Sequence, residues 1–141
     1  YNDAIRIDPN YALYYRNKGN ALSDLGRRDE AMECYNEAIR INPNEAEAYN
    51  GIGDIYYNDK RYEEAVKYYN DAIRIDPNYA LYYRNKGNPL LNLGRRDEAM
   101  NCYNEAIRLD PNEDNAYNGI GNILKNEKRY EEAIKHYNDA I

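Results

Sequence analysis

The chain has 141 residues, of which 43% are hydrophobic and 31% charged, a composition typical neither of a disordered chain nor of a membrane-embedded one. Its formal net charge of −6 is unsuited to a phosphate backbone, which argues against nucleic acid as the main ligand. Cys34 and Cys102 occupy equivalent places in a duplication, where stacking keeps them too far apart for a disulfide. We therefore expect two free thiols, which favour a reducing and thus cytoplasmic compartment.

A period of 34 runs through the chain and predicts a repeat architecture. Columns of Tyr, Ala and Pro follow this spacing, as does a column of glycines, namely Gly19, Gly53, Gly87 and Gly121. A second period of 68 lies on top, because residues 1–73 and 69–141 differ at only 14 of 73 positions. The natural unit is therefore a pair of repeats, produced by recent duplication or by engineering.

The predicted elements begin with residues 1–11, the trailing helix of a preceding repeat. Because residues 1–5 repeat residues 137–141, the chain starts inside a predicted helix and is interpreted as a fragment of a longer protein. Repeat 1 spans residues 12–45, repeat 2 residues 46–79, repeat 3 residues 80–113 and a truncated repeat 4 residues 114–141.

Each repeat is predicted to hold a helix, a short turn, a second helix and a connection marked by proline. Tyr49, Ile52, Gly53 and Tyr56 recur at i, i+3, i+4 and i+7, which is one face of a helix. Acidic pairs are expected to open second helices, where they meet the positive end of the helix dipole; these are Glu63-Glu64 and Glu131-Glu132. A single hairpin cannot bury its apolar faces, so the repeats should stack into a superhelix with a concave face.

The pattern resembles the tetratricopeptide repeat, in which an aromatic-x2-Leu-Gly-x2-Tyr segment precedes Ala-x3-aromatic and a proline. Residues 49–56, 65–69 and Pro77 match it, and the resemblance covers the whole chain. It implies an all-α fold, a right-handed superhelical array of antiparallel helix pairs. It also implies a scaffold for protein–protein interaction.

The sequence offers no recognisable catalytic chemistry, so we expect neither an enzyme nor a catalytic residue. His136 is the single histidine, and neither cysteine has a partner at zinc spacing, so no metal and no cofactor are expected. Gly51 and Gly53 lie within a predicted helix rather than after a strand, which excludes a phosphate-binding loop.

The resemblance places a polar stripe of the first helices along the concave groove. The candidate peptide-binding residues are Arg16, Asn17, Asn20, Asn50, Asp54, Arg84, Asn85, Asn88, Asn118 and Asn122. A carboxamide offers donors and an acceptor that match an extended peptide backbone, and an arginine can hold a carboxylate. The alternative is that asparagine, which is abundant throughout this chain, occupies the groove through compositional bias.

The segment from Tyr15 to Asn20 also resembles the first repeat of co-chaperones that clamp the C-terminal carboxylate of heat-shock chaperones. The remainder of that clamp differs, because Gly51 stands in place of Asn, and Leu81 and Asn85 in place of Lys and Arg. The asparagine ladders of long tetratricopeptide superhelices, which hold peptide backbone, are the better match.

Two functions follow from these observations. The first is a module that binds a protein or extended peptide in its groove, without nucleic acid or membrane as a partner. The alternative is a structural spacer or self-assembling array without a dedicated peptide ligand, whose uncapped ends stack head to tail.

Overall fold

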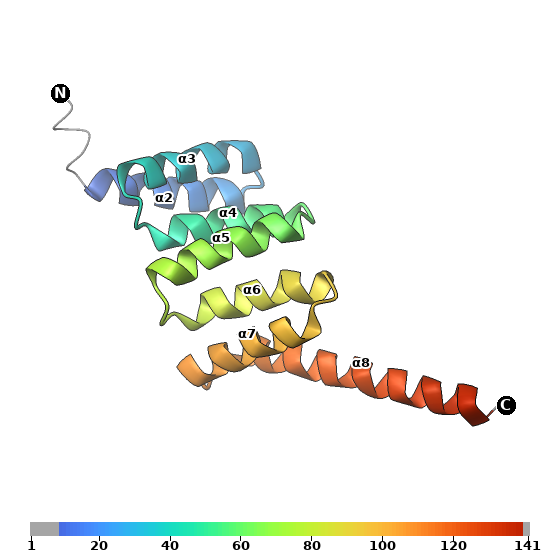
Figure 1. Cartoon of the computed structure of the whole chain (residues 1–141). Coiled ribbons are helices and arrows are strands. Elements are labelled where there is room, and N and C mark those ends of the chain that lie inside the picture. Colours follow the sequence, from blue (N-terminus) through green and yellow to red (C-terminus); the bar gives the residue numbers. More distant parts are fainter. Residues whose placement is uncertain (1–8, 140–141) are drawn as a thin grey trace.

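The computed structural model describes residues 9–139, which form helices and short turns (Figure 1). The helices are α2 (Pro9–Asp24), α3 (Arg28–Ile41), α4 (Ala46–Asn58), α5 (Tyr62–Ile75), α6 (Ala80–Asn92), α7 (Arg96–Leu109) and α8 (Asp114–Asp139). This confirms the predicted all-α solenoid of helical repeats. Most of the expected trailing helix at residues 1–11 lies outside the described residues, as do residues 140 and 141.

Three antiparallel hairpins stack along the solenoid: α2 with α3, α4 with α5, and α6 with α7 (Figure 1). The first helices also contact one another, α2 with α4, α4 with α6 and α6 with α8. They therefore form one layer, and the second helices form the other. The first-helix layer positions the polar stripe.

The turn inside each hairpin requires a left-handed backbone at one residue. Gly26 and Gly94 adopt φ values of +80° and +78°, which glycine does without steric penalty. Lys60 occupies the same place in repeat 2 at φ +64°. A side chain in this conformation costs roughly 1–2 kcal/mol, so this turn is less favourable than the other two.

Helix α2 begins at Pro9, three residues before the expected start of repeat 1 at residue 12. Proline is tolerated in a first helical turn because the N–H that it lacks has no intrahelical acceptor there. Pro43 and Pro111, at the equivalent places later in the chain, instead follow the ends of α3 and α7. In these two connections the side chains of Asn42 and Asp110 accept hydrogen bonds from the N–H groups of Asn44 (3.1 Å) and Asn112 (3.0 Å).

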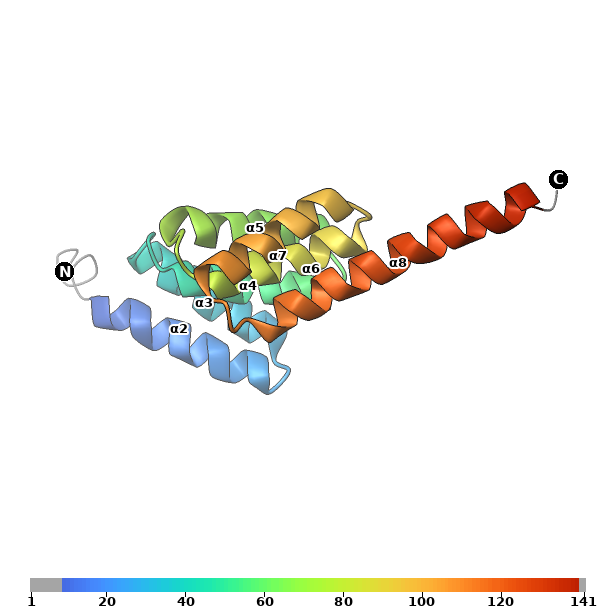
Figure 2. The same ribbon diagram turned by 90° about the horizontal axis from the view of Figure 1, so that it is seen from below.

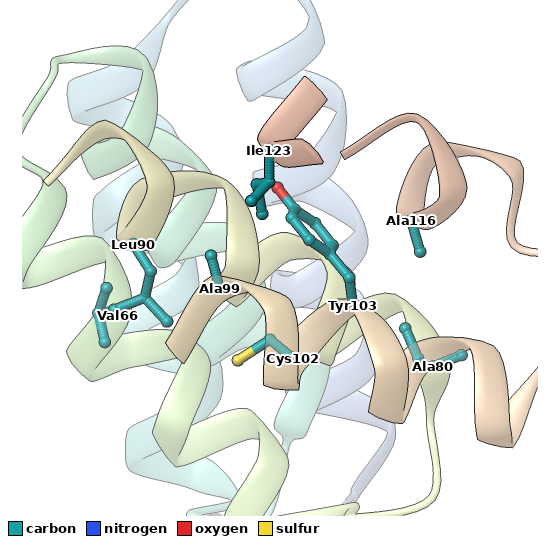
Figure 3. Close-up of a cluster of buried hydrophobic side chains, with 9 residues drawn as sticks. Val66, Ala80, Leu90, Ala99, Cys102, Tyr103, Ala116 and Ile123 are labelled. Carbon is teal, nitrogen blue, oxygen red and sulfur yellow. The ribbon is translucent and has the colours of Figure 1, made fainter. Parts of the chain in front are cut away.

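A tyrosine ring seated against a glycine closes each hairpin. Tyr35, Tyr69 and Tyr103 on the second helices are among the most buried side chains. A Cβ atom added to the paired glycine of the first helix would lie within 3 Å of the ring; these glycines are Gly19, Gly53 and Gly87. Figure 3 shows Tyr103 in the core between α6, α7 and α8, with its ring directed toward Ile123.

Repeat 4 differs from the prediction of a second helix that opens at Glu131-Glu132. Helix α8 continues without a turn to Asp139 and extends beyond the stacked hairpins (Figures 1 and 2). The prediction was wrong because it took the turn from the repeat pattern. In this copy Glu127 replaces Asp59 of the repeat 2 turn, and Glu favours helix more than Asp does.

Substitution of Gly53 by alanine should lower the free energy of unfolding by about 1–3 kcal/mol, since the new methyl group would clash with the buried ring of Tyr69. In a Tyr69→Leu background the same change should be neutral or stabilising by ~0.5–1 kcal/mol, because alanine favours helix over glycine. Chemical denaturation of the four proteins gives the coupling energy. Equal costs in both backgrounds would refute the ring–glycine contact.

Candidate functional site

A solvent-open cavity of about 290 Å³ lies between α2 and α4. Its lining residues are Asn20, Ser23, Asp24, Tyr35, Glu47, Asn50, Gly51 and Asp54. The structure thus brings together three of the predicted groove residues, Asn20, Asn50 and Asp54. A second cavity of about 300 Å³ is lined by Arg16, Glu45 and Tyr82 among others, and Glu47 borders both.

Buried phenol groups hold three groove side chains in place. The hydroxyl of Tyr35 donates to Oδ1 of Asn20 at 2.6 Å, and that of Tyr103 donates to Oδ1 of Asn88 at 2.6 Å. Tyr69 donates in the same way to the carboxylate of Asp54. Since each carbonyl oxygen accepts from a phenol, the Nδ2 donors of Asn20 and Asn88 remain available for a ligand.

This role of the tyrosines was not predicted from the sequence. The available signal was the choice of Tyr over Phe in a buried column, with a polar residue 15 positions earlier in each of the three hairpins. A buried hydroxyl needs a hydrogen-bond partner, so the column itself indicated a polar neighbour.

Asn50 and Asn85 form a polar contact between repeats. Nδ2 of Asn85 donates to Oδ1 of Asn50 at 2.9 Å, and both residues are only 8% exposed. Asn85 therefore joins α6 to α4, whereas Asn50 also lines the cavity. Such a satisfied buried pair fixes the register of neighbouring repeats.

The two groove arginines have acidic partners within the chain. Nη1 of Arg16 lies 2.9 Å from Glu45 and 2.6 Å from Glu47. Nε of Arg84 lies 3.3 Å from Glu113, close enough for an ion pair but without hydrogen-bond geometry. Arg16 therefore joins α2 to the start of α4, and Arg84 joins α6 to the residue just before α8. A ligand carboxylate would have to compete with these contacts.

The remaining candidate residues lie outside the cavity. Asn17 is exposed, and its Oδ1 accepts from Arg16 at 3.2 Å. Asn118 and Asn122 are exposed on α8. In a closed fourth hairpin Asn122 would accept a hydrogen bond from the hydroxyl of Tyr137. In the continuous helix α8 the two residues are too far apart for this contact.

Negative charge dominates the cavity between α2 and α4. Its lining, as far as the chain is described, holds three carboxylates and neither Lys nor Arg. Burial, followed by the charges of Asp54, Asp24 and Glu47, raises the pKa of Tyr35 well above its usual value. Burial also raises the pKa of Asp54, although the Tyr69 hydrogen bond and the Arg84 charge act in the opposite direction.

Within residues 9–139, no group of three or more His, Cys, Asp or Glu side chains is placed to hold a metal ion. No helix in this range combines the length and the apolar character needed to cross a membrane. Cys34 and Cys102 are both free and buried, so the expectation of two free thiols is confirmed.

Replacement of Asp54 by asparagine should raise the melting temperature at pH 7. Because burial raises the folded-state pKa of this carboxyl above its unfolded value, the ionised form costs stability, and the protein loses stability as the pH rises through the folded pKa. The gain from Asp54→Asn should disappear in acid, where Asp54 is protonated. Melting curves of the variant and of the reverse change, Asn88→Asp, at pH 3 to 7 test this; a gain independent of pH would contradict it.

Two family models match the sequence, one described as "Tetratricopeptide repeat" over residues 16–80 and one as "TPR repeat" over residues 87–128. The first TPR of Spaghetti (RPAP3) bound to HSP90 peptide SRMEEVD is 26% identical, with a TM-score of 0.82, and the match covers 88% of this chain and 98% of that one. The NMR structure of the first TPR domain of human RPAP3 gives the same identity and TM-score over 89% and 98%.

The Arabidopsis OM64 TPR domain, 23% identical with a TM-score of 0.80 over 84% of this chain and 98% of that one, shares the fold. No curated protein sequence matches at a significant level. The repeat columns, the stacked hairpins and both family models agree: the chain belongs to the tetratricopeptide repeat family, whose members are typically non-enzymatic modules of protein–protein interaction.

Proposed function

We propose that this protein binds an extended segment of a partner protein in its concave groove, and that the segment places a Lys or Arg side chain over the cavity between α2 and α4. The observation that carries this proposal is the composition of the cavity, in which three carboxylates and two asparagines line one hollow. Such a site offers charge to a cation and hydrogen bonds to the backbone beside it.

The amide groups supply the contact to the main chain. Tyr35 and Tyr103 hold Asn20 and Asn88 through their carbonyl oxygens, which leaves the Nδ2 donors to meet peptide carbonyls. Because these side chains are already fixed, the ligand does not have to immobilise them, and less entropy is lost on binding.

The charge pattern disfavours an acidic ligand. The peptide in the similar RPAP3 structure, SRMEEVD, contains three acidic residues. Here Asp24, Glu47 and Asp54 would repel such a segment, and Arg16 is already paired with Glu45 and Glu47. A basic segment matches both the cavity and the net charge of −6.

A peptide-display selection on this protein should enrich segments that contain Lys or Arg. The variant Asp24→Asn/Asp54→Asn should then bind the enriched peptide at least about tenfold more weakly, and the loss should shrink at high salt. Both changes are compatible with the fold, because Asn92 and Asn88 occupy the corresponding places in repeat 3.

The matched control is Glu33→Asn/Asp97→Asn, which removes the same charge from exposed positions on α3 and α7. It should leave the affinity unchanged. Enrichment of acidic peptides, or equal losses in both variants, would contradict a cation site in the groove.

A second candidate function, a self-assembling array, is favoured by the surface of α2. Tyr14 is 56% exposed, whereas its copy Tyr82 in repeat 3 is 3% exposed. A second copy stacked head to tail would cover this face. Such stacking is open-ended, so the mass in solution would keep rising with concentration.

A further inference from the structure

Two nearly identical segments of this protein adopt different folds. Residues 46–71 form the α4–turn–α5 hairpin, whereas residues 114–139 form the single helix α8. The two segments differ at only eight positions. The eight positions and the contacts around them show what favours the continuous helix in repeat 4.

Several of the differences remove ring contacts that hold the repeat 2 hairpin together. The rings of Tyr56 and Tyr68 stack at 5.4 Å between centroids, and the guanidinium of Arg61 lies 4.7 Å from the Tyr56 centroid. In α8 the corresponding residues are Leu124 and His136, so neither the tyrosine stack nor its cation–π contact is available.

Two more differences act near the turn. Tyr57 and Tyr62 contact each other across the turn at 5.7 Å, and Lys125 replaces Tyr57 in α8. Glu127 replaces Asp59, and both Lys and Glu favour helix more than the residues that they replace.

The turn itself would be strained in repeat 4. Closing the hairpin would place Lys128 in the left-handed conformation that Lys60 adopts at φ +64°, where repeats 1 and 3 have glycine. That conformation costs roughly 1–2 kcal/mol, and a continuous helix avoids the cost.

The open helix leaves complementary apolar surfaces uncovered at its two ends. Gly121 has no atom within 4 Å of an added Cβ, although Gly53 at the same place receives the ring of Tyr69. Tyr137 is 76% exposed, against 2% for Tyr69. The uncovered glycine, Gly121, and the tyrosine ring that would pack on it, Tyr137, are therefore both present on α8. They lie too far apart to meet within one straight helix.

We propose that α8 is exchanged between two copies of this chain. The distal half of α8, residues 130–139, packs on the proximal half, residues 114–126, of the second copy, so that Tyr137 lies against the partner's Gly121. The two helices run antiparallel, as α4 and α5 do, and a twofold axis near residue 128 makes the exchange reciprocal.

The second copy is the occupant that the sequence supports best. The α4–α5 hairpin shows the packing that these apolar positions adopt, and α8 carries the same residue as that hairpin at all but eight positions. Exchange restores that packing in both copies while Lys128 remains helical. The assembly is closed because the same surface of each copy serves both sides of the interface.

Sedimentation equilibrium over a range of concentrations tests the exchange. The 16.6 kDa chain should form a dimer that does not grow further, and Lys128→Gly should be a monomer because glycine allows the hairpin to close within one chain. The same change in repeat 2, Lys60→Gly, should leave the dimer intact, since that hairpin is already closed. A monomeric wild-type protein, or a Lys128→Gly variant as dimeric as the wild type, would overturn the proposal.

A second pair of variants separates exchange from head-to-tail stacking. Tyr137→Ala should dissociate the dimer, whereas Tyr14→Ala, on the exposed face of α2, should not. Circular dichroism checks that both variants keep their helical content. Dissociation by Tyr14→Ala alone, or a mass that rises without limit, would show stacking and overturn the exchange.

Discussion

The contact between a tyrosine ring and a glycine is the constraint on which the rest of this structure depends. It sets how closely the two helices of a hairpin approach, because any side chain at Gly19, Gly53 or Gly87 would meet the ring. It also brings the phenol hydroxyl to the first-helix layer, where it donates a hydrogen bond to Asn20, Asp54 or Asn88. Packing and site geometry are therefore two consequences of one side chain.

The same contact gives the period of 68 a physical basis. Tyr35 and Tyr103 each lie between two glycines, the second being Gly51 and Gly119 on the following first helix. On the first helix that follows Tyr69, the position of this second glycine is occupied by Asn85, which donates a hydrogen bond to Asn50 of the preceding repeat. Successive interfaces between repeats thus alternate between a tyrosine ring packed between two glycines and a buried pair of asparagines. The structural unit that recurs is therefore a pair of repeats, as the period of 68 indicates.

The sequence was sufficient for the family, the all-α solenoid and the free state of Cys34 and Cys102, because each follows from spacing. It was insufficient for α8, since the residues that define the repeat are unchanged there and the outcome depends on ring contacts at other positions. It also did not reveal the acidic partners of Arg16 and Arg84, because Glu45 and Glu113 lie at the far end of the same repeats and meet the arginines only once the following first helix is packed in place.

The distance between spin labels at positions 118 and 138 tests most directly whether the fourth hairpin stays open, with Tyr137 away from Gly121 of the same chain. The labels would be attached through Asn118→Cys and Asn138→Cys in a Cys34→Ser/Cys102→Ser background, diluted with unlabelled protein so that only distances within one chain are measured. A continuous helix separates positions 20 residues apart by about 30 Å. A closed hairpin would bring the same positions to about 10 Å, the spacing of packed helices. The account predicts the long distance of the continuous helix α8, in which Tyr137 does not reach Gly121 of the same chain, and the short distance of a closed hairpin would contradict it.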